Sequence, residues 1–451
     1  MGEHERWGSG DMAGRAAAML RANDLGGWTK AAPRLYPHQW SWDSAFIAIG
    51  LAHLDPRRAA QELRSLFAAQ WRNGMVPHIV FNPAVPPGSY FPDAERWNTT
   101  ALAAAPPPLP VRTSGILQPP VHAIAASRIW EAAQQRSEAE AEAALPFLGE
   151  VYPRLLAWHR YLLTARDPER SGLVTIYHPW ESGTDNSPRW DSALAAVAVG
   201  DLPPYTRFDL RHVADPTQRP TNAEYDRYLW LVELLKRARY DDAAVVASYP
   251  FLVKDVLISG ILVAANEALL RIAESLQAPD RERAEIDAWI ARGKQGLAAR
   301  WDDALGLALD YDLRAAASIP VRTVAGFAPL VAGGLDAARR AALLATLDSP
   351  GFLGHPALRW PVPPSTSPLD PAFRPRRYWR GPTWPVITWL LWWSLGRMGE
   401  GERARRLRAA ALDQIATAGF AEYVEPFSGE PLGSADQSWT AAVALDWLAA
   451  D

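Results

Sequence analysis

Acids, an amide and tryptophans crowd around one glycine in Tyr177–Asp191, which reads YHPWESGTDNSPRWD. Gly183 permits a turn that presents the residues after it. A carboxylic acid held there can protonate a leaving oxygen if burial or a nearby carboxylate raises its pKa. Glu181 and Asp185 are both candidates for this acid. Asp185 could instead cap the helix expected to start near Pro188.

A second group of acids lies near the C-terminus in the segment GFAEYVEPFSGEPLGSADQ, where glycines and prolines favour a loop. Glu422, Glu425 and Glu430 compete here for the role of a general base, and each taken singly is more often a solvated loop acid. Gln437 lies on the helix predicted after this loop. An acid from the first segment and a base from this one would form the carboxylate pair that hydrolyses glycosides.

Tryptophan is abundant, with 21 residues, and about half of them lie in loops flanked by proline or glycine. In the segment YPHQWSWD, Trp40 and Trp42 flank Asp43. A carboxylate can accept two hydroxyl hydrogen bonds while an aromatic ring covers the C–H face of a sugar. The alternative is that Asp43 only caps the helix after it.

Three further segments could line the same site. An arginine beside tyrosines can bind a carboxylate with two hydrogen bonds, and aromatic side chains around a Gly-Pro turn can form a wall. Surface or core roles are common alternatives for these residue types. The segments are SGILQPP with Gln118, RPTNAEY with Arg219 and Tyr225, and RRYWRGPTW with Tyr378, Trp379, Arg380 and Trp384.

The dominant hydrophobic period is helical, and no alternation of period two extends beyond a few residues, so a large sheet is not expected. Asp55, Asp280 and Ser434 are helix-start signals. The segment 241–277 should break near Tyr249-Pro250. The predicted helices are 11–23, 42–53, 56–71, 121–135, 141–163, 225–239, two within 241–277, 280–301, 336–347, 382–395, 401–418 and 435–449.

Long proline-rich segments separate these helices, at 82–92, 105–110, 201–221 and 350–380. Segments of this length in a compact protein are usually functional or disordered. They contain Tyr90, Arg219, Tyr378 and Trp379, which favours function. About a dozen helices without a composition break predict one domain over residues 1–451, an all-α barrel of six inner and six outer helices. The run 253–272, apolar on nearly all faces, is expected to be an inner helix.

The charge balance excludes some partners. With 46 basic and 50 acidic residues and a net charge of −4, the chain lacks the basic excess typical of proteins that bind nucleic acids or membrane surfaces. The absence of cysteine fits a reducing cytoplasm. The N-terminus does not resemble a secretory signal, and the most apolar run, 256–265, is about half as long as a membrane span. A homo-oligomer is compatible with the sequence.

Two of these motifs resemble those of a known family. The segments ESGTDNSPRW and EYVEPFSG are similar to the acid-bearing and base-bearing motifs of glycoside hydrolase family 63 and the related trehalases, and YPHQWSWD is similar to the family's first aromatic motif. The resemblance covers about Tyr36–Trp447. It implies an (α/α)6 barrel and an inverting mechanism, with Asp185 as acid and Glu422 as base. Ser428 replaces the usual Thr and keeps its hydroxyl.

Within this family, the length and the other motifs most resemble bacterial glucosylglycerate and mannosylglycerate hydrolases. The resemblance implies an anionic small-molecule substrate and no cofactor or metal. Arg219 would bind the glycerate carboxylate. The residues implied for the sugar are Tyr36, Trp42, Asp43, Gln118, Trp180, Gly183, Trp384 and Gln437, and those implied for the glycerate are Trp40, Tyr90, Arg219, Tyr225, Tyr378 and Trp379.

Two alternative functions remain at this point. One is an α-glucosidase or α-mannosidase of the same clan that acts on a neutral disaccharide. The other is a sugar epimerase or isomerase on the same helical barrel, which would use histidines as acid and base. Among the nine histidines, His38 and His178 lie inside the motifs. Between glucose and mannose, glucosylglycerate is favoured.

Overall fold

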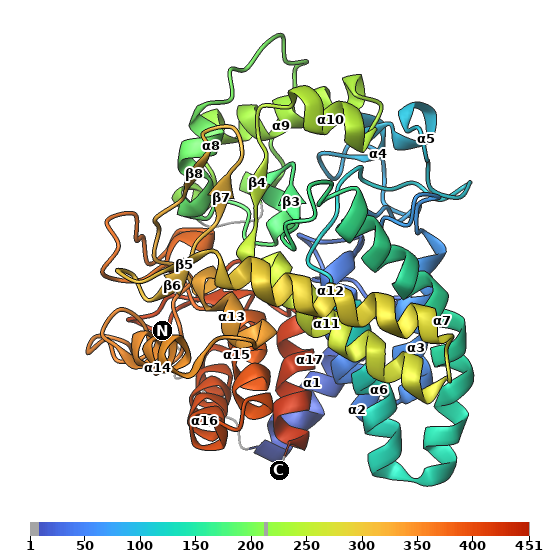
Figure 1. The fold of residues 1–451 in the computed structure, drawn as a ribbon, viewed down its shortest axis with the longest axis vertical. Helices are drawn as coiled ribbons and strands as arrows, with labels where there is room; N and C mark the ends of the chain where they lie inside the picture. The colour runs from blue at the N-terminus through green and yellow to red at the C-terminus, as the bar shows by residue number, and fades with distance from the viewer. Residues whose placement is uncertain (1–8, 212–214, 451) are drawn as a thin grey trace.

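Six helices form a closed inner ring in the computed structural model, which describes residues 9–211 and 215–450. Each packs on the next and the last packs on the first (Figure 1). The inner helices are α2 (Ser41–Leu54), α6 (His122–Arg136), α11 (Val256–Ser275), α13 (Ala328–Ala332), α15 (Pro385–Arg397) and α17 (Ser438–Ala449).

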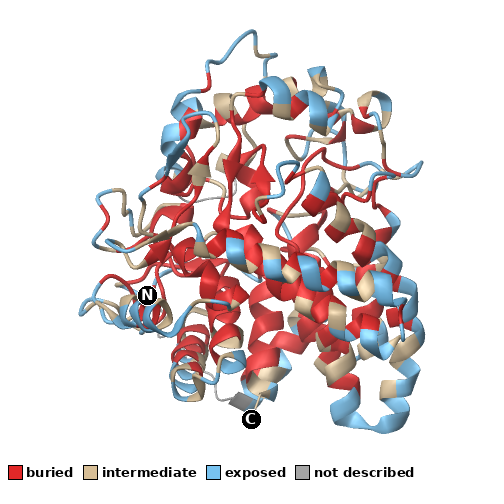
Figure 2. Ribbon diagram, in the orientation of Figure 1, coloured by how far each residue is buried: buried red, intermediate tan, exposed pale blue. Residues whose placement is uncertain are grey.

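A second set of helices surrounds this ring, so the predicted all-α barrel is confirmed. These outer helices bury one face against the ring and expose the other, as Figure 2 shows for α12, and this pattern explains their amphipathic sequences. They are α1 (Ser9–Asn23), α3 (Pro56–Ala68), α7 (Glu138–Thr164), α12 (Asp280–Ala298), α14 (Ala337–Asp348) and α16 (Gly401–Ala418).

Helix α11 shows why the ring is so apolar. It has 20 residues, so it is longer than the apolar run noted in the sequence and long enough to cross a bilayer, yet 83% of its most apolar stretch is buried inside the protein. It packs against α6, α7, α12 and α13. Burial from several sides requires apolar residues all round a helix, and α11 is therefore an inner helix of the barrel.

The connections between the ring helices carry the remaining short elements, and their short helices lie at the upper end in Figure 1. Their helices are α4 (Ala94–Trp97), α5 (Thr99–Leu102), α8 (Asp191–Ala195), α9 (Asn222–Arg237) and α10 (Asp242–Ser248). The 3-10 turns are η1 (Pro179–Ser182), η2 (Pro188–Trp190), η3 (Asp209–Arg211), η4 (Pro216–Gln218), η5 (Val324–Phe327) and η6 (Tyr378–Arg380).

Ten two-residue strands join these connections into small antiparallel sheets. The largest has the strand order β3-β4-β7-β8. The strands are β1 (Gln39–Trp40), β2 (Ile79–Val80), β3 (Thr175–Ile176), β4 (Val253–Lys254), β5 (Trp301–Asp302), β6 (Leu307–Ala308), β7 (Tyr311–Asp312), β8 (Ala317–Ser318), β9 (Tyr423–Val424) and β10 (Pro431–Leu432). Strands this short leave no alternating pattern in the sequence.

The structure shifts several predicted helix boundaries by about three residues, and the last helix is one example. The last helix begins at Ser438 rather than near Ala435, and Gln437 is its N-cap. Ser434, expected as a helix-start signal, lies in the preceding loop. Serine satisfies backbone and side-chain partners equally well in loops and at caps, so its type alone does not fix the boundary. The break expected near Tyr249-Pro250 is confirmed, between α10 and β4.

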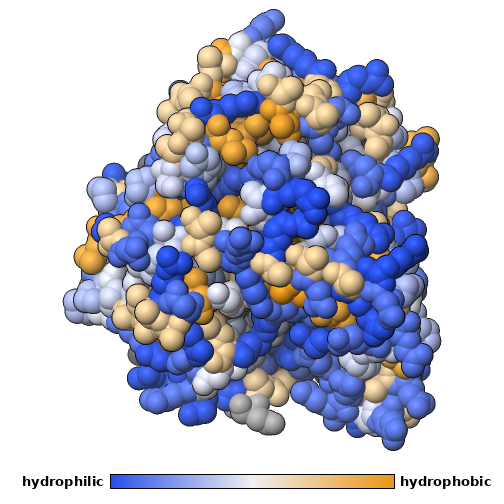
Figure 3. Space-filling model, viewed as in Figure 1, coloured by the Kyte–Doolittle hydropathy of each residue, from blue (hydrophilic) through white to orange (hydrophobic). Residues whose placement is uncertain are grey.

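The face of the molecule in Figure 3 is mostly hydrophilic, with apolar residues in small separate groups. Scattered apolar residues of this kind are normal on a protein surface. Most of the N-terminal stretch that did not resemble a secretory signal, residues 1–8, lies outside the described part of the chain.

Candidate active site

The N-terminal ends of inner helices converge on one cavity. Asp43 lies in the first turn of α2, Gln118 lies just before α6, and Gln437 is the N-cap of α17. We call this space the carboxylate cavity because three carboxyl groups face it. Its lining residues are Tyr36, Trp40, Trp42, Asp43, His78, Gln118, Gly183, Asp185, Tyr378, Trp379, Glu422, Gln437 and Trp439.

A second space adjoins the first, and we call it the arginine cavity after Arg219. Residues 89–92, 208–209 and 219–220 line it together with Trp180 and Tyr225. Five residues line both cavities and therefore mark their junction. These junction residues are Tyr36, Trp40, His78, Asp185 and Tyr378.

Asp185 is positioned as a protonated acid at this junction. It does not cap the following turn, because Ser187 does so. Burial raises the pKa of Asp185 to about 7; the Arg219 charge opposes this rise, and the Glu422 charge adds to it. A carboxyl group with this pKa holds its proton near neutral pH and can donate it to a substrate oxygen.

Glu422, in contrast, is held by groups that favour its charged form. The Tyr36 hydroxyl donates a hydrogen bond to Glu422 Oε1 at 2.7 Å, and the Ser434 backbone N–H donates to Oε2 at 2.8 Å. Burial raises the pKa of Glu422 above its usual value, and the Arg219 charge and these two donors oppose the rise. Two carboxyl groups in one cavity with such different surroundings are suited to acid and base roles.

Gly433 makes room for this carboxylate. Its φ is +72°, and a Cβ atom added there would lie 2.4 Å from Glu422 Oε2 and 2.5 Å from a ring carbon of Tyr423. Sequence reasoning missed this role. The sequence shows a glycine in the loop after Glu422, which indicates a turn or a close contact but not the residue that it contacts.

We expect Gly433→Ala to lower kcat by about 100-fold, because a misplacement of about 1 Å in a catalytic group can cost that factor. The added Cβ collides with the Glu422 side chain and with the Tyr423 ring, so the Glu422 carboxylate cannot keep its position. Steady-state kinetics with the substrate proposed below measure the effect.

Gly399→Ala is the matched control, since Gly399 has a φ of +79° and open space around it. Both variants carry the strain of a left-handed backbone, but only Gly433→Ala collides with Glu422. Equal kcat values for the two variants would show that Gly433 does not position the base.

The other candidate acids have structural partners. Glu181 receives two hydrogen bonds from the Arg166 guanidinium, each 2.9 Å long. Glu425 accepts the Ser428 hydroxyl at 2.6 Å, and Glu430 pairs with Arg376 at the surface. Burial and the Glu422 charge, rather than Glu181, raise the pKa of Asp185.

Asp43 is the third carboxyl group of the cavity. It does not cap α2, which has Trp40 as its N-cap and no side-chain cap. Burial raises the pKa of Asp43 well above its usual range, and the charges of Glu422 and Asp185 add to the rise. Its side chain is 5% exposed and is free to bind hydroxyl groups that enter the cavity.

Arg219 is buried with an unused donor. Its Nη1 lacks a hydrogen-bond partner among the described residues, its Nε lies 3.5 Å from Asp209 Oδ2, and its guanidinium stacks 4.3 Å over the Tyr378 ring. A buried guanidinium with a free N–H is ready to bind an anion. Arg380, the second candidate cation, is instead paired with Asp191.

The structure distributes the aromatic residues between the two cavities differently from the sugar and glycerate groups that the family resemblance implied. Trp379 lines the carboxylate cavity, and Trp384 stacks behind it with the ring centroids 3.6 Å apart. Trp384 itself lines neither cavity, and Trp180 lines only the arginine cavity. Gly183 allows Trp42 to approach, because an added Cβ would lie 2.7 Å from its ring.

Sequence reasoning missed several lining residues. They belong to none of the motifs recognised in the sequence, and only the fold brings them together. They are Trp439 and His78 in the carboxylate cavity and Arg34, Leu35, His78, Phe208 and Asp209 in the arginine cavity.

The histidines noted in the motifs do not form an acid–base pair. His178 accepts a hydrogen bond from the Trp180 backbone N–H, and its Nε2 lies 3.0 Å from the Tyr228 carbonyl. His38 lines neither of the two cavities. Burial lowers the pKa of both side chains to about 3. This arrangement does not support the epimerase alternative.

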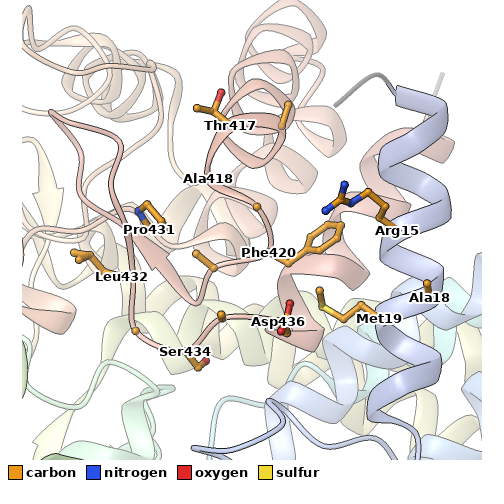
Figure 4. Close-up of a pocket in the computed structure, with 15 residues that line it drawn as sticks. Arg15, Ala18, Met19, Thr417, Ala418, Phe420, Pro431, Leu432, Ser434 and Asp436 are labelled. Carbon is orange, nitrogen blue, oxygen red and sulfur yellow. The ribbon is translucent and has the colours of Figure 1, made fainter. Parts of the chain in front are cut away.

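A more spacious cavity lies between α1 and the loop that carries Glu422 (Figure 4). Met19, Phe420 and Leu432 line much of its wall, and Asp436 is the one acid among its described lining residues. Without a carboxyl pair it cannot perform the acid–base chemistry of the carboxylate cavity. Ser434, whose backbone N–H donates to Glu422, also lines this cavity.

Comparison with known proteins gives a consistent result. The family model for the mannosylglycerate hydrolase MGH1-like glycoside hydrolase domain matches residues 36–440. The chain is 51% identical over 437 residues to a glucosylglycerate hydrolase from Mycolicibacterium hassiacum, with 97% of each chain covered. It is 42% identical to a mannosylglycerate hydrolase from Thermus thermophilus, covering 96% of this chain and 99% of that one.

The fold agrees with a solved structure of the same kind. The crystal structure of a GH63 mannosylglycerate hydrolase from Thermus thermophilus in complex with Tris and D-glycerate has a TM-score of 0.88 and 41% identity to this chain. The match covers 97% of this chain and 99% of the chain in that crystal structure. The predicted (α/α)6 barrel is therefore confirmed over almost the whole chain.

Proposed function

Since the chain belongs to the mannosylglycerate hydrolase MGH1-like family of glycoside hydrolases, we propose that it hydrolyses the α-glycosidic bond of glucosylglycerate with inversion, releasing glucose and D-glycerate. Asp185 is the general acid and Glu422 the general base. The observation that carries this proposal is the position of Asp185 at the junction between a cavity with three carboxyl groups and a cavity with a buried arginine.

Each cavity suits one half of this substrate. Hydroxyl groups of a sugar match the polar lining of the carboxylate cavity, where Asp43, Gln118 and Gln437 present hydrogen-bonding groups beside Trp42. The glycerate carboxylate matches the free donor of Arg219 in the arginine cavity. The glycosidic bond then spans the junction within reach of Asp185.

The reaction follows from this placement. Asp185 donates its proton to the glycosidic oxygen as the bond to the anomeric carbon breaks. Glu422, ionised, takes a proton from a water molecule that attacks the opposite face of the sugar, and its hydrogen bond from Tyr36 keeps it oriented. This mechanism requires the two carboxyl groups to lie about 6.5–9.5 Å apart, which leaves room for the water.

The aromatic residues complete the two cavities. Trp42 and Trp379 would cover the faces of the sugar, and Trp384 would support Trp379 from behind. Trp180 would contact the glycerate half rather than the sugar, because of the cavity that it lines. Trp40, Tyr90, Tyr225 and Tyr378 would enclose the glycerate with Arg219.

Mannosylglycerate is the second candidate substrate, since relatives 42% identical are mannosylglycerate hydrolases. An assay with glucosylglycerate, mannosylglycerate, kojibiose and trehalose separates these candidates from a neutral disaccharide. We expect the highest kcat/KM with glucosylglycerate. The highest kcat/KM with kojibiose or trehalose would contradict the proposal.

The variant Arg219→Gln tests whether Arg219 binds the glycerate carboxylate of the substrate. Loss of a charge-assisted hydrogen bond costs about 1.5–3 kcal/mol, so we expect kcat/KM with glucosylglycerate to fall about 100-fold, mainly through KM. With glucosylglycerol, which has no carboxylate, the fall should be less than about fivefold, because no charge pair is lost.

Arg34→Gln provides a matched control, since Arg34 lines the same cavity but is exposed at its mouth. An exposed charge contributes little, about 1 kcal/mol or less, so its loss should change kcat/KM with either substrate by less than about fivefold. If Arg219→Gln impaired both substrates equally, Arg219 would not be the carboxylate-binding residue.

We also propose that residues 1–451 form one catalytic domain. One large cluster of buried apolar residues, which extends from Met12 to Trp447 beside a small second cluster of Ala31, Trp40 and Ile79, supports this proposal. A cytoplasmic location is proposed from the absence of cysteine. Limited proteolysis that releases a stably folded fragment would contradict the single domain.

A further inference from the structure

One of the five junction residues has no role in the mechanism above. Asp185 is the acid, Tyr36 holds the base, and the rings of Trp40 and Tyr378 form walls. His78 is the fifth. The scissile bond must cross the junction, because it joins the sugar in one cavity to the glycerate in the other. His78 is therefore placed beside the scissile bond.

The backbone holds His78 firmly in this position. Its N–H donates to the Ile116 carbonyl at 2.7 Å, and its own carbonyl accepts from the Ser41 N–H at 3.0 Å. These bonds tie it to the segments before α6 and at the start of α2. The side chain is 7% exposed, so its imidazole is fixed without being covered completely.

The imidazole has no side-chain hydrogen bond to the described residues. Nδ1 is fully buried without a partner, whereas Nε2 is the ring nitrogen left to face the cavities. Burial lowers the pKa of His78 to about 3, and nearby His178 contributes to this fall. The ring is therefore neutral while the enzyme works and carries one N–H.

The proton of this neutral ring belongs on Nε2. A buried N–H without an acceptor is rarer and costlier in proteins than a buried acceptor without a donor. With the proton on Nε2, the buried Nδ1 is only an unused acceptor. Nε2–H is then a hydrogen-bond donor directed at the bound substrate.

Three sugar oxygens lie next to the scissile bond. The glycosidic oxygen takes its proton from Asp185. The ring oxygen becomes positively charged in the oxocarbenium-like transition state, so a donor there would oppose the reaction. The C2 hydroxyl remains, and hydrogen bonds to it strengthen in the transition state of glycoside hydrolysis.

We propose, on the basis of the function proposed above, that His78 contacts the substrate by donating a hydrogen bond from Nε2–H to the C2 hydroxyl oxygen. Glucose and mannose differ in configuration at this carbon. His78 therefore also affects the choice between glucosylglycerate and mannosylglycerate.

The test compares glucosylglycerate with its 2-deoxy analogue for the parent enzyme and for His78→Leu. We expect His78→Leu to lower kcat/KM with glucosylglycerate about 10-fold or more, as loss of a hydrogen bond at a buried site does. Removal of the C2 hydroxyl from the substrate should then lower kcat/KM of the parent by a factor about 10 times larger than the factor for His78→Leu. The intrinsic reactivity of the 2-deoxy compound affects both enzymes equally and cancels.

The 4-deoxy analogue is the control, because C4 lies away from the scissile bond. The ratio of kcat/KM with glucosylglycerate to kcat/KM with the 4-deoxy analogue should be the same for the parent and for His78→Leu. If the 2-deoxy loss were also the same in both enzymes, His78 would not contact the C2 hydroxyl. A parent enzyme that does not hydrolyse glucosylglycerate would contradict the proposed function instead. The comparison would then use the substrate that the parent does hydrolyse.

Two amide variants of His78 provide a second test that does not depend on whether His78→Leu folds. The amide nitrogen of His78→Gln can occupy the place of Nε2, whereas that of His78→Asn lies nearer Nδ1. We expect His78→Gln to retain the dependence on the C2 hydroxyl and His78→Asn to lose it. The same dependence in both variants would contradict a donor at Nε2.

Discussion

Replacing Asp185 with asparagine is expected to lower kcat with glucosylglycerate by about 10²–10⁴-fold, the factor that general acid catalysis typically supplies, while KM changes little. The amide keeps the size and polarity of the carboxyl group but cannot deliver a proton to the glycosidic oxygen. Steady-state kinetics and a thermal melting curve, which should show an intact fold, test this prediction.

A substrate with an activated leaving group provides the control for Asp185→Asn. α-Glucosyl fluoride needs little protonation to leave, so the variant should retain far more of the parent's activity with fluoride than with glucosylglycerate. Near-normal turnover of glucosylglycerate by Asp185→Asn would exclude Asp185 as the acid.

The pH dependence follows from the same group. Asp185 works protonated, so activity is present below its pKa, which is about 7 in the free enzyme, and is lost as the pH rises through this value. We expect the alkaline limb of kcat/KM near pH 7. In Arg219→Gln this limb should move to higher pH, because the Arg219 charge lowers the pKa of Asp185. If the alkaline limb of Arg219→Gln stayed at the parent's pH, the Arg219 charge would not affect the pKa of Asp185.

Replacing Glu422 with glutamine should have an equally large effect. The amide cannot accept a proton from the attacking water, so kcat should fall by about 10²–10⁴-fold. In contrast to Asp185→Asn, the loss should be as large with α-glucosyl fluoride, because the leaving group does not affect the activation of water. This difference separates the base from the acid.

Glu425→Gln is the matched control for Glu422→Gln. Both are glutamates in the same loop, but Glu425 stabilises a turn by accepting hydrogen bonds from Phe427 and Ser428. Its replacement should lower the melting temperature and change kcat by less than about threefold. A loss in Glu425→Gln as large as in Glu422→Gln would contradict the choice of base.

Much of the barrel could be predicted from the sequence because helices leave a strong period. The break at Tyr249-Pro250 and the buried helix α11 were both expected. The boundary near Ser434 was wrong, since a serine suits a loop as well as a cap. Only the folded loop shows that Ser434 donates its backbone N–H to Glu422.

The acid and base could be chosen only by their resemblance to a family. Residue types left Glu181 and Asp185 equal, because the partner that neutralises Glu181 is Arg166, which lies outside the motif. Likewise, Glu425 and Glu430 differ from Glu422 only through contacts that the fold creates.

The direction of aromatic side chains was the least predictable feature. Trp379 and Trp384 lie in one motif, yet one faces the carboxylate cavity and the other stacks behind it. Spacing along an irregular loop does not determine which ring faces a cavity. His78 was missed for a related reason: an isolated histidine has no pattern, and its importance comes from the junction at which the fold places it.

The most direct test is to follow the hydrolysis of glucosylglycerate by ¹H NMR from the first minutes. An inverting enzyme with Asp185 as acid and Glu422 as base predicts that β-glucose and D-glycerate appear first, and that α-glucose grows later by mutarotation. Initial release of α-glucose, or no release of glucose and glycerate at all, would contradict this account.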